Sequence, residues 1–168
     1  VTADVRGNLA PATVVIQDPP GKNWINDRWQ AASDMGGTAI PGQHWVQLEF
    51  EKPIRVTKVI LDWEAAFAKN YRLEGLNSVD SDEWCVLYDG SDETQESRRT
   101  VEESGQSPGV KRKMPLHVIH TISILDSTRK LLHGNTECRP KILRVFINKP
   151  FRVWGVSLWQ LDVYGFVI

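Results

Sequence analysis

Several classes of protein are excluded by what this sequence has little of. It has only two cysteines, Cys85 and Cys138, so it is not a small domain held together by a framework of disulfides. The two residues either form a single bridge or remain buried thiols, and their spacing does not decide between these outcomes. No apolar run approaches the roughly 20 residues that a helix needs to span a bilayer.

The chain also lacks an excess of charge of either sign. Its 20 Lys and Arg residues nearly balance its 21 Asp and Glu residues, which leaves a formal net charge of −1. A nearly neutral protein has no overall field that attracts nucleic acid or an anionic membrane. We therefore expect no nucleic-acid partner.

Motifs that carry catalytic or metal chemistry are missing as well. The sequence contains no His-Glu-x-x-His, Gly-x-Ser-x-Gly, phosphate-loop or Cys-x-x-Cys motif. His117 and His120 are three residues apart in a strand-like run, so they point to opposite faces and cannot share a metal. Glu64 lies beside Trp63, but one carboxylate there suits a hydroxyl-rich ligand, whereas a glycosidase needs two positioned carboxylates. We expect no enzymatic activity.

What the sequence does have is alternation with a period of two. Apolar and polar residues alternate in short runs, which are bounded by turn residues such as Pro41-Gly42 and Asp89-Gly90. The runs lie at residues 12–16, 46–50, 59–63, 71–73, 84–88, 118–125, 143–147 and 159–163. No segment carries a sustained helical stripe. Eight or so short strands with frequent turns predict an all-β fold, either a sandwich or a barrel.

The length of 168 residues suits a single domain with one core. We expect that domain to comprise residues 1–168, with its core between residues 12 and 165. Residues 91–113 are polar and poor in apolar side chains, and they predict a long surface loop. Its basic groups, Arg98-Arg99 and Lys111-Arg112-Lys113, are either solvated or form a patch for phosphate or sulfate.

Tryptophan is unusually frequent, with seven residues. A tryptophan either fills a core or lies flat under the ring of a ligand. We expect four of the seven in the core: Trp29, Trp45, Trp63 and Trp159. The remaining ones, Trp24 among them, call for another explanation.

Five segments resemble the discoidin, or coagulation-factor type C, superfamily, and most closely its carbohydrate-binding modules of family 32, which are galactose-binding-domain-like. The run Trp-Gly-Val-Ser-Leu-Trp-Gln-Leu-Asp-Val-Tyr-Gly at residues 154–165 is similar to the closing strand of that superfamily. The run Leu-Asp-Trp-Glu-Ala-Ala-Phe-Ala-Lys-Asn-Tyr-Arg-Leu-Glu at residues 61–74 closely resembles a stretch of the family 32 modules. The other similar segments are residues 28–33, 44–50 and 142–145, whereas residues 91–140 do not match well.

This resemblance implies an eight-stranded antiparallel jelly-roll β-sandwich with its ligand loops at one end. The three loops at that end are residues 18–27, 34–44 and 63–70. The implied function is that of a non-catalytic, lectin-like module, alone or attached to a larger protein or partner enzyme, that binds a glycan. Galactose-type sugars are the family's commonest ligands, and the implied location is extracellular, secreted or at the cell surface.

A sugar site in these loops needs a flat apolar face for the ring and fixed polar groups for the hydroxyls. Trp24 and Phe67 are candidate platforms, unless Trp24 packs on its own loop and Phe67 anchors its loop. The candidate hydrogen-bonding residues are His44, Glu64, Lys69, Asn70 and Arg72. Alternatively, His44 caps a turn and Glu64 pairs with Lys69 to brace the loop. Asn70 and Arg72 would then simply face solvent from a strand.

Domains of this family often hold a structural calcium between the first of these loops and a Glu of the closing strand. In this chain Gln160 stands at the position of that Glu, so it offers a carbonyl oxygen but no charge. The other candidate ligands are Asp18, Asn23, Asn26 and Asp27. The alternative is a loop tied by hydrogen bonds of the Gln160 amide, without an ion.

Two further functions compete with glycan binding. Some discoidin domains press apolar loops into anionic phospholipid, and Trp24, Ile25 and Phe67 suit this role, although nearby carboxylates would be repelled by anionic headgroups. The third function is protein adhesion, with residues 91–140 as the contact surface. A shared fold does not transfer function, so the glycan hypothesis depends on the residues of the loops.

Overall fold

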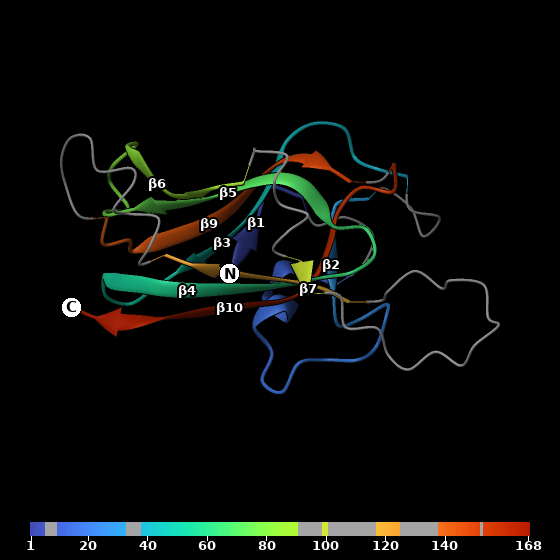
Figure 1. Cartoon of the computed structure of the whole chain (residues 1–168), viewed down its shortest axis with the longest axis horizontal. Coiled ribbons are helices and arrows are strands. Elements are labelled where there is room, and N and C mark those ends of the chain that lie inside the picture. The colour runs from blue at the N-terminus through green and yellow to red at the C-terminus, as the bar shows by residue number, and fades with distance from the viewer. Residues whose placement is uncertain (6–9, 33–37, 91–98, 101–116, 125–137, 152) are drawn as a thin grey trace.

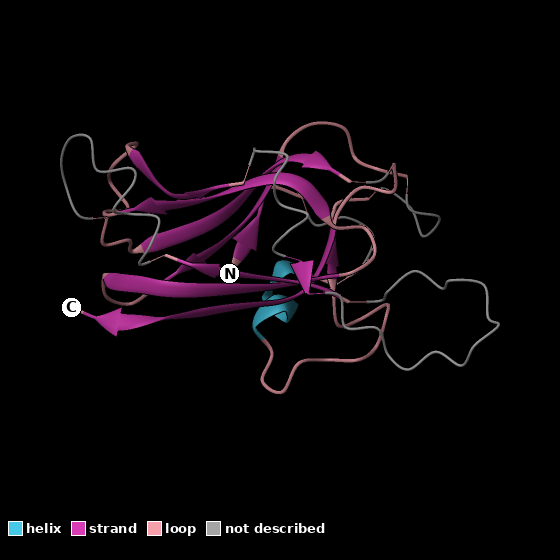
Figure 2. Ribbon diagram, viewed as in Figure 1, coloured by secondary structure: helices cyan, strands magenta, loops and turns pink. Residues whose placement is uncertain are grey.

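The computed structural model of the chain consists of two antiparallel β-sheets packed face to face (Figure 1). It describes residues 1–5, 10–32, 38–90, 99–100, 117–124, 138–151 and 153–168, and the statements below refer to these residues. Apart from one short helix, the described chain consists of strands and loops (Figure 2). The predicted all-β antiparallel sandwich is confirmed.

Each sheet is built from strands that are distant in the sequence. The first sheet contains, in spatial order, β1 (Thr2–Ala3), β3 (His44–Glu49), β9 (Ile142–Pro150), β5 (Ala68–Leu76) and β6 (Trp84–Asp89). The second sheet contains β2 (Trp29–Gln30), β10 (Ser157–Val167), β4 (Ile54–Trp63), β8 (Val118–Ser123) and β7 (Arg99–Thr100). In Figure 1 the C-terminal end of β10 lies at the left and β2 lies at the right.

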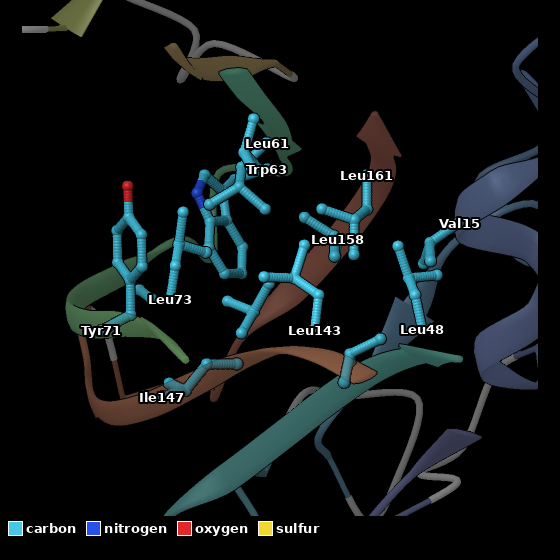
Figure 3. Close-up of a cluster of buried hydrophobic side chains, with 14 of the residues drawn as sticks. Val15, Leu48, Leu61, Trp63, Tyr71, Leu73, Leu143, Ile147, Leu158 and Leu161 are labelled. Carbon is cyan, nitrogen blue, oxygen red and sulfur yellow. The ribbon is translucent and has the colours of Figure 1, made fainter. Parts of the chain in front are cut away.

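The core lies between the sheets, where each strand turns alternate side chains inward. Figure 3 shows core side chains from both sheets, together with Val15 of the helical segment at residues 12–16: Leu48, Leu61, Trp63, Tyr71, Leu73, Leu143, Ile147, Leu158 and Leu161. Burial of apolar surface stabilises the fold by about 25 cal/mol per Å². This packed layer gives the loops at its ends a rigid base.

Of the four tryptophans predicted in the core, Trp29 and Trp63 belong to it, whereas Trp159 is buried outside it. Trp29, Trp63 and Trp159 are almost inaccessible to solvent. Trp45 is only half-buried, because it lies on the outer face of β3, between the buried residues His44 and Val46. The alternation of β3 was predicted correctly, but the large size of Trp45 made it look like a core residue.

The run at residues 12–16 was predicted to be a strand, and this prediction is wrong. It forms the 3-10 helix η1 (Ala12–Ile16), which begins after Pro11. Its buried residues are Ala12, Val14 and Val15, and this spacing fits a helical turn rather than alternation with a period of two.

Within the described chain, no helix is long and apolar enough to cross a membrane.

The longest strand pair, β4 with β10, is interrupted at one point. Leu158 pairs with Trp63 and Gln160 pairs with Asp62, so Trp159 is an extra residue in β10. Because of this bulge, Leu158 and Leu161 both remain in the core, while Trp159 and Gln160 lie outside it.

Cys85 and Cys138 form a disulfide, with their Cα atoms 6.2 Å apart. The choice between a bridge and two thiols is thereby decided in favour of the bridge. The bridge joins β6 to the segment before β9, and the whole predicted loop at residues 91–113 lies between its two cysteines in the sequence. Only Arg99 and Thr100 of that loop are described, and they form β7, which pairs with β8. Arg98 and residues 111–113 lie outside the described residues.

Candidate functional site

Four chain segments meet at the end of the sandwich where β4 ends and β5 and β10 begin. Backbone hydrogen bonds join the loop after β4 to the segment before β10: Glu64 N–H donates to the Ser157 carbonyl (3.0 Å) and Ser157 N–H donates to the Ala66 carbonyl (2.8 Å). Ala31 N–H donates to the Val156 carbonyl (2.9 Å), and Ile40 N–H donates to the Ala31 carbonyl (3.3 Å). We call this end the tip, formed by residues 22–32, 38–44, 63–70, 151 and 153–157. The resemblance had predicted three of these four segments. Residues 33–37 of the predicted second loop lie outside the described chain.

Gly155 allows the segment before β10 to lie directly against the chain beside β2. Its φ angle is +84°, a backbone conformation that residues with a Cβ rarely adopt. A Cβ at this position would lie 2.4 Å from the Ala31 carbonyl oxygen. The tip is therefore closed by a contact that only glycine permits.

Arg28 is the buried centre of the tip, with 1% of its surface exposed. Its Nε donates to the Trp24 carbonyl oxygen (2.8 Å), and its Nη1 donates to the Ser157 hydroxyl. The same Nη1 lies 3.8 Å from Glu64 Oε2. Burial lowers the pKa of Arg28 and the nearby Glu64 carboxylate opposes this change, so the buried positive charge needs these partners.

Trp24, the first predicted platform, lies on the surface of the tip and rests on Arg28. The Arg28 guanidinium carbon is 4.1 Å from the centroid of the Trp24 ring, which is a cation–π contact. The tryptophan nevertheless remains 43% exposed. The Trp24 ring is therefore exposed to solvent, and the buried Arg28 side chain supports it from one face.

Glu64 contacts the same Arg28 guanidinium that supports this ring. Its Oε2 accepts a hydrogen bond from Ala66 N–H (2.8 Å) and faces Arg28. Its Oε1 has no hydrogen-bond partner among the described residues, although only 13% of the side chain is exposed. The expected pair with Lys69 is not formed, since Arg28 is the basic partner.

Phe67, the second predicted platform, is buried and belongs to the core. Its ring stacks on the ring of Phe151, with the ring centroids 4.3 Å apart. Phe67 therefore anchors its loop, which was the alternative to its role as a platform. Phe151 and Trp154 are 38% and 39% exposed and are the aromatic residues that this segment presents to solvent. Neither was predicted. In the sequence, Trp154 is marked only as the first residue of the run at residues 154–165 that resembles the closing strand of the family.

The structure does not bring His44 or Arg72 to the surface of the tip. Both ring nitrogens of buried His44 are engaged, Nδ1 by Asp4 Oδ2 (2.7 Å) and Nε2 by the Ile40 carbonyl oxygen (2.9 Å). His44 therefore joins β3 to the chain start and to the tip. Arg72 lies on the outer face of the first sheet, where it forms an ion pair with Glu74 Oε1 (2.9 Å).

Lys69 and Asn70 lie at the start of β5, at the edge of the tip. Lys69 is exposed and Asn70 is half-buried. Neither side chain has a hydrogen bond or ion pair with a described residue. They remain available to a ligand that extends beyond Glu64.

Two of the predicted calcium ligands, Asp27 and Asn23, already accept hydrogen bonds from the backbone of their own loop. Asp27 Oδ2 accepts hydrogen bonds from the N–H groups of Lys22 (2.8 Å) and Asn23 (2.7 Å). Asn23 Oδ1 accepts from the N–H groups of Ile25 (2.9 Å) and Asn26 (3.1 Å). These oxygens therefore stabilise the loop itself, and the side chains of Asp18 and Asn26 are exposed.

Gln160, the remaining predicted calcium ligand, is also engaged through its amide nitrogen. Its amide nitrogen Nε2 donates to the Gln17 carbonyl oxygen (3.2 Å) and to Asp162 Oδ1 (3.0 Å), so an N–H donor faces the oxygens that a cation would need. Among the described residues, no group of three or more His, Cys, Asp or Glu could hold a metal ion. The hydrogen bond from the Gln160 amide to Gln17 is the interaction expected if the loop is held without an ion.

Comparisons with solved structures show the fold. Chitosan-binding module 1 of a chitosanase/glucanase from Paenibacillus sp. IK-5 has a TM-score of 0.59 at 19% identity, over 98% of this chain and 92% of that chain. A selenomethionine-labelled mutant of the same module has a TM-score of 0.57 at 18% identity, with the same coverage. Module 2 of that enzyme, in complex with chitotriose, has a TM-score of 0.50 at 21% identity, over 83% and 78% of the two chains. The sequence matches no protein-family model and no curated protein. The chain thus has the β-sandwich fold of these carbohydrate-binding modules.

Proposed function

We propose that this chain is a non-catalytic, glycan-binding module of the discoidin and family 32 type, and that its site is the tip. The observation that carries the proposal is that buried Arg28 supports both the exposed Trp24 ring and Glu64, whose Oε1 has no hydrogen-bond partner among the described residues. An aromatic face and a nearby carboxylate are the two elements that sugar recognition needs. The other carboxylate among the described residues of the tip, Asp27, accepts hydrogen bonds from the backbone N–H groups of Lys22 and Asn23, whereas glycosidic chemistry needs two carboxylates positioned around the sugar bond.

In this proposal, the sugar ring places its C–H face on the indole of Trp24. Glu64 Oε1 accepts a hydrogen bond from a hydroxyl or ammonium group of the same sugar. Phe151 and Trp154 provide further apolar surface for a neighbouring sugar. Lys69 and Asn70 provide polar groups at the edge of the site.

The class of ligand is suggested by the structural neighbours described above, which are two chitosan-binding modules of one enzyme and a mutant of the first. We take chitosan-type oligosaccharides as the first ligands to test, because a carboxylate at the site suits an amino sugar. Galactose-type sugars, which the family resemblance implies, are the second ligands to test.

The proposal includes a location and a context for the module. The Cys85–Cys138 disulfide is consistent with an oxidising, extracellular environment. Because the similar modules derive from a chitosanase/glucanase, we propose that this chain directs a larger protein or partner enzyme to its glycan.

A glycan array with the wild-type chain, Trp24→Ala and Trp154→Ala tests this function. We expect selective binding to one glycan class, with signals lowered about tenfold in Trp24→Ala, because the platform is lost. Phe166→Ala is the control, since Phe166 is also exposed but lies near the other end of β10. If no glycan binds, or if all three variants bind as the wild type does, the proposal fails.

Anionic lipid is the second candidate ligand, because Trp24 and Ile25 are both exposed in the same turn. Sedimentation with phosphatidylserine vesicles distinguishes the two ligands. Glycan binding predicts no sedimentation, whereas lipid binding predicts sedimentation that Trp24→Ala and Ile25→Ala both reduce.

A further inference from the structure

A groove with a volume of about 650 Å³ lies on the side of the sandwich, away from the residues that form the tip. It is lined by the end of β3 and the middle of β10, together with residues that follow η1. Nothing in the proposed tip site uses these residues.

The charged side chains that line the groove are all acidic. They are Asp18, Glu49 and Asp162, and no Lys, Arg or His side chain lines the groove. None of the three forms an ion pair with a described residue. The described side chains therefore give the groove a negative surface that favours a cation, although Val1, which carries the α-amino group, also lines it.

Gln160 adds a hydrogen-bond acceptor that the protein leaves without a donor. It lines the groove and is only 7% exposed. Its Nε2 is bonded to Gln17 and Asp162, but its buried Oε1 has no partner. An unpaired buried acceptor is unfavourable, and a donor brought by a ligand would remove that cost. The groove thus has several acceptors and few donors, which suits a ligand rich in donors.

Two aromatic residues give the groove an apolar surface. Phe50 is half-buried and Tyr164 is exposed, and both line it. Lys58 Nζ lies 4.0 Å from the centroid of the Tyr164 ring, which is a cation–π contact on one face of that ring. The rest of the exposed Tyr164 ring remains for the C–H face of a sugar, and Phe50, which packs against the core, adds partly buried apolar surface beside it.

We propose that this groove binds the ammonium-bearing sugars of a de-N-acetylated, chitosan-type glycan, as a second contact beside the tip. An ammonium group has three N–H donors and a positive charge, which match the carboxylates of Asp18, Glu49 and Asp162. An N-acetylated sugar lacks that charge, so the groove selects amino sugars. The inference rests on the proposed function for its class of ligand, but it depends on different residues.

The test is an NMR titration of the ¹⁵N-labelled chain with the fully de-N-acetylated glucosamine hexasaccharide. The side-chain amide of Gln160 reports on the groove, and the indole N–H of Trp24 reports on the tip. The variant is D18N/E49Q, in which two unpaired carboxylates become amides of the same shape. The matched control is D82N/E83Q, which changes the net charge equally at two exposed residues between β5 and β6.

We expect the Gln160 and Trp24 signals both to shift in the wild type. D18N/E49Q should bind the hexasaccharide about fivefold more weakly than D82N/E83Q, by a factor that shrinks as salt is added. The N-acetylated hexasaccharide should bind the two variants equally, because it has no ammonium group.

The two proposals fail in different ways. If the Trp24 signal shifts alone and the two variants bind equally, the groove is not a site and the tip stands. If the Gln160 signal shifts alone, the groove stands and the tip is not a site. If neither signal shifts, both proposals are overturned.

Discussion

Arg28 is the residue on which the geometry of the tip depends most. It supports the ring of Trp24, bonds to its carbonyl oxygen and to Ser157, and is the basic partner of Glu64. These contacts provide the buried Arg28 guanidinium with acceptors, a carboxylate and an aromatic face. A buried charge is tolerated only when it is paired in this way.

Replacing Arg28 should therefore destabilise the fold. We expect Arg28→Ala to lower the free energy of unfolding by about 3 kcal/mol or more, because it leaves Glu64 and Ser157 without their partner. Arg28→Lys should lower it less, since the charge remains but the fork of donors is lost. Urea unfolding followed by circular dichroism measures both. A loss below about 1 kcal/mol for Arg28→Ala would show that the contacts contribute little.

Sequence patterns indicate some of these residues but not their arrangement. Trp24 and Glu64 were predicted because their residue types suit a sugar and their segments match the ligand loops of a family. His44 and Phe67 were predicted on the same grounds, but both are buried. Whether a side chain in a loop faces solvent depends on tertiary contacts, such as those of His44 with Asp4, that no local pattern contains.

At the scale of elements, the loop between η1 and β2 is stabilised by its own side chains. Asp27 and Asn23 accept hydrogen bonds from the backbone of the loop, and Gln160 ties it to β10. Because the residue is Gln rather than Glu, an amide donor can do this without a cation. The loop therefore keeps its conformation through hydrogen bonds alone.

This arrangement predicts a fold that does not depend on calcium. We expect EDTA or added calcium to change the Tm of the wild-type chain by less than about 1 °C in differential scanning calorimetry. Gln160→Glu should lower the Tm by several degrees, about 1–2 kcal/mol, because it removes the donor and places a carboxylate beside Asp162. A fall of several degrees on adding EDTA to the wild type would instead establish a calcium site.

The strands were more predictable than the loops, for a physical reason. Alternation with a period of two follows directly from a strand that has one buried face, as in β3. The run at residues 12–16 became η1 because Pro11 and the spacing of its buried residues favour a turn. The bulge at Trp159 was not predictable, because register depends on both strands of the pair.

At the scale of the whole molecule, the Cys85–Cys138 disulfide links β6 to the segment before β9, two parts of the chain that are 53 residues apart in the sequence. We expect the double variant C85S/C138S to lower the free energy of unfolding by about 2–4 kcal/mol, because the unfolded chain gains freedom over a separation of 53 residues. Urea unfolding of the oxidised wild type and of this variant measures the difference. An unchanged free energy would show that the bridge constrains neither state.

The all-β sandwich could be read from the alternating runs and from the segments that resemble a family. The function of its tip could be read only as a hypothesis, since the fold is shared by domains that bind different ligands. The support for glycan binding therefore comes from Trp24, Arg28 and Glu64 as the structure arranges them.

Isothermal titration with chitotriose, using the wild-type chain, Glu64→Gln and the control Glu83→Gln, tests this central claim most directly. Glu64 Oε1 is the free acceptor at the tip, whereas Glu83 is exposed far along the first sheet, before β6. We expect the wild type and Glu83→Gln to bind equally and Glu64→Gln to bind about tenfold more weakly, because a charged hydrogen bond is lost. Equal binding by all three proteins, or no binding by the wild type, would contradict the assignment of the tip as a site for this glycan.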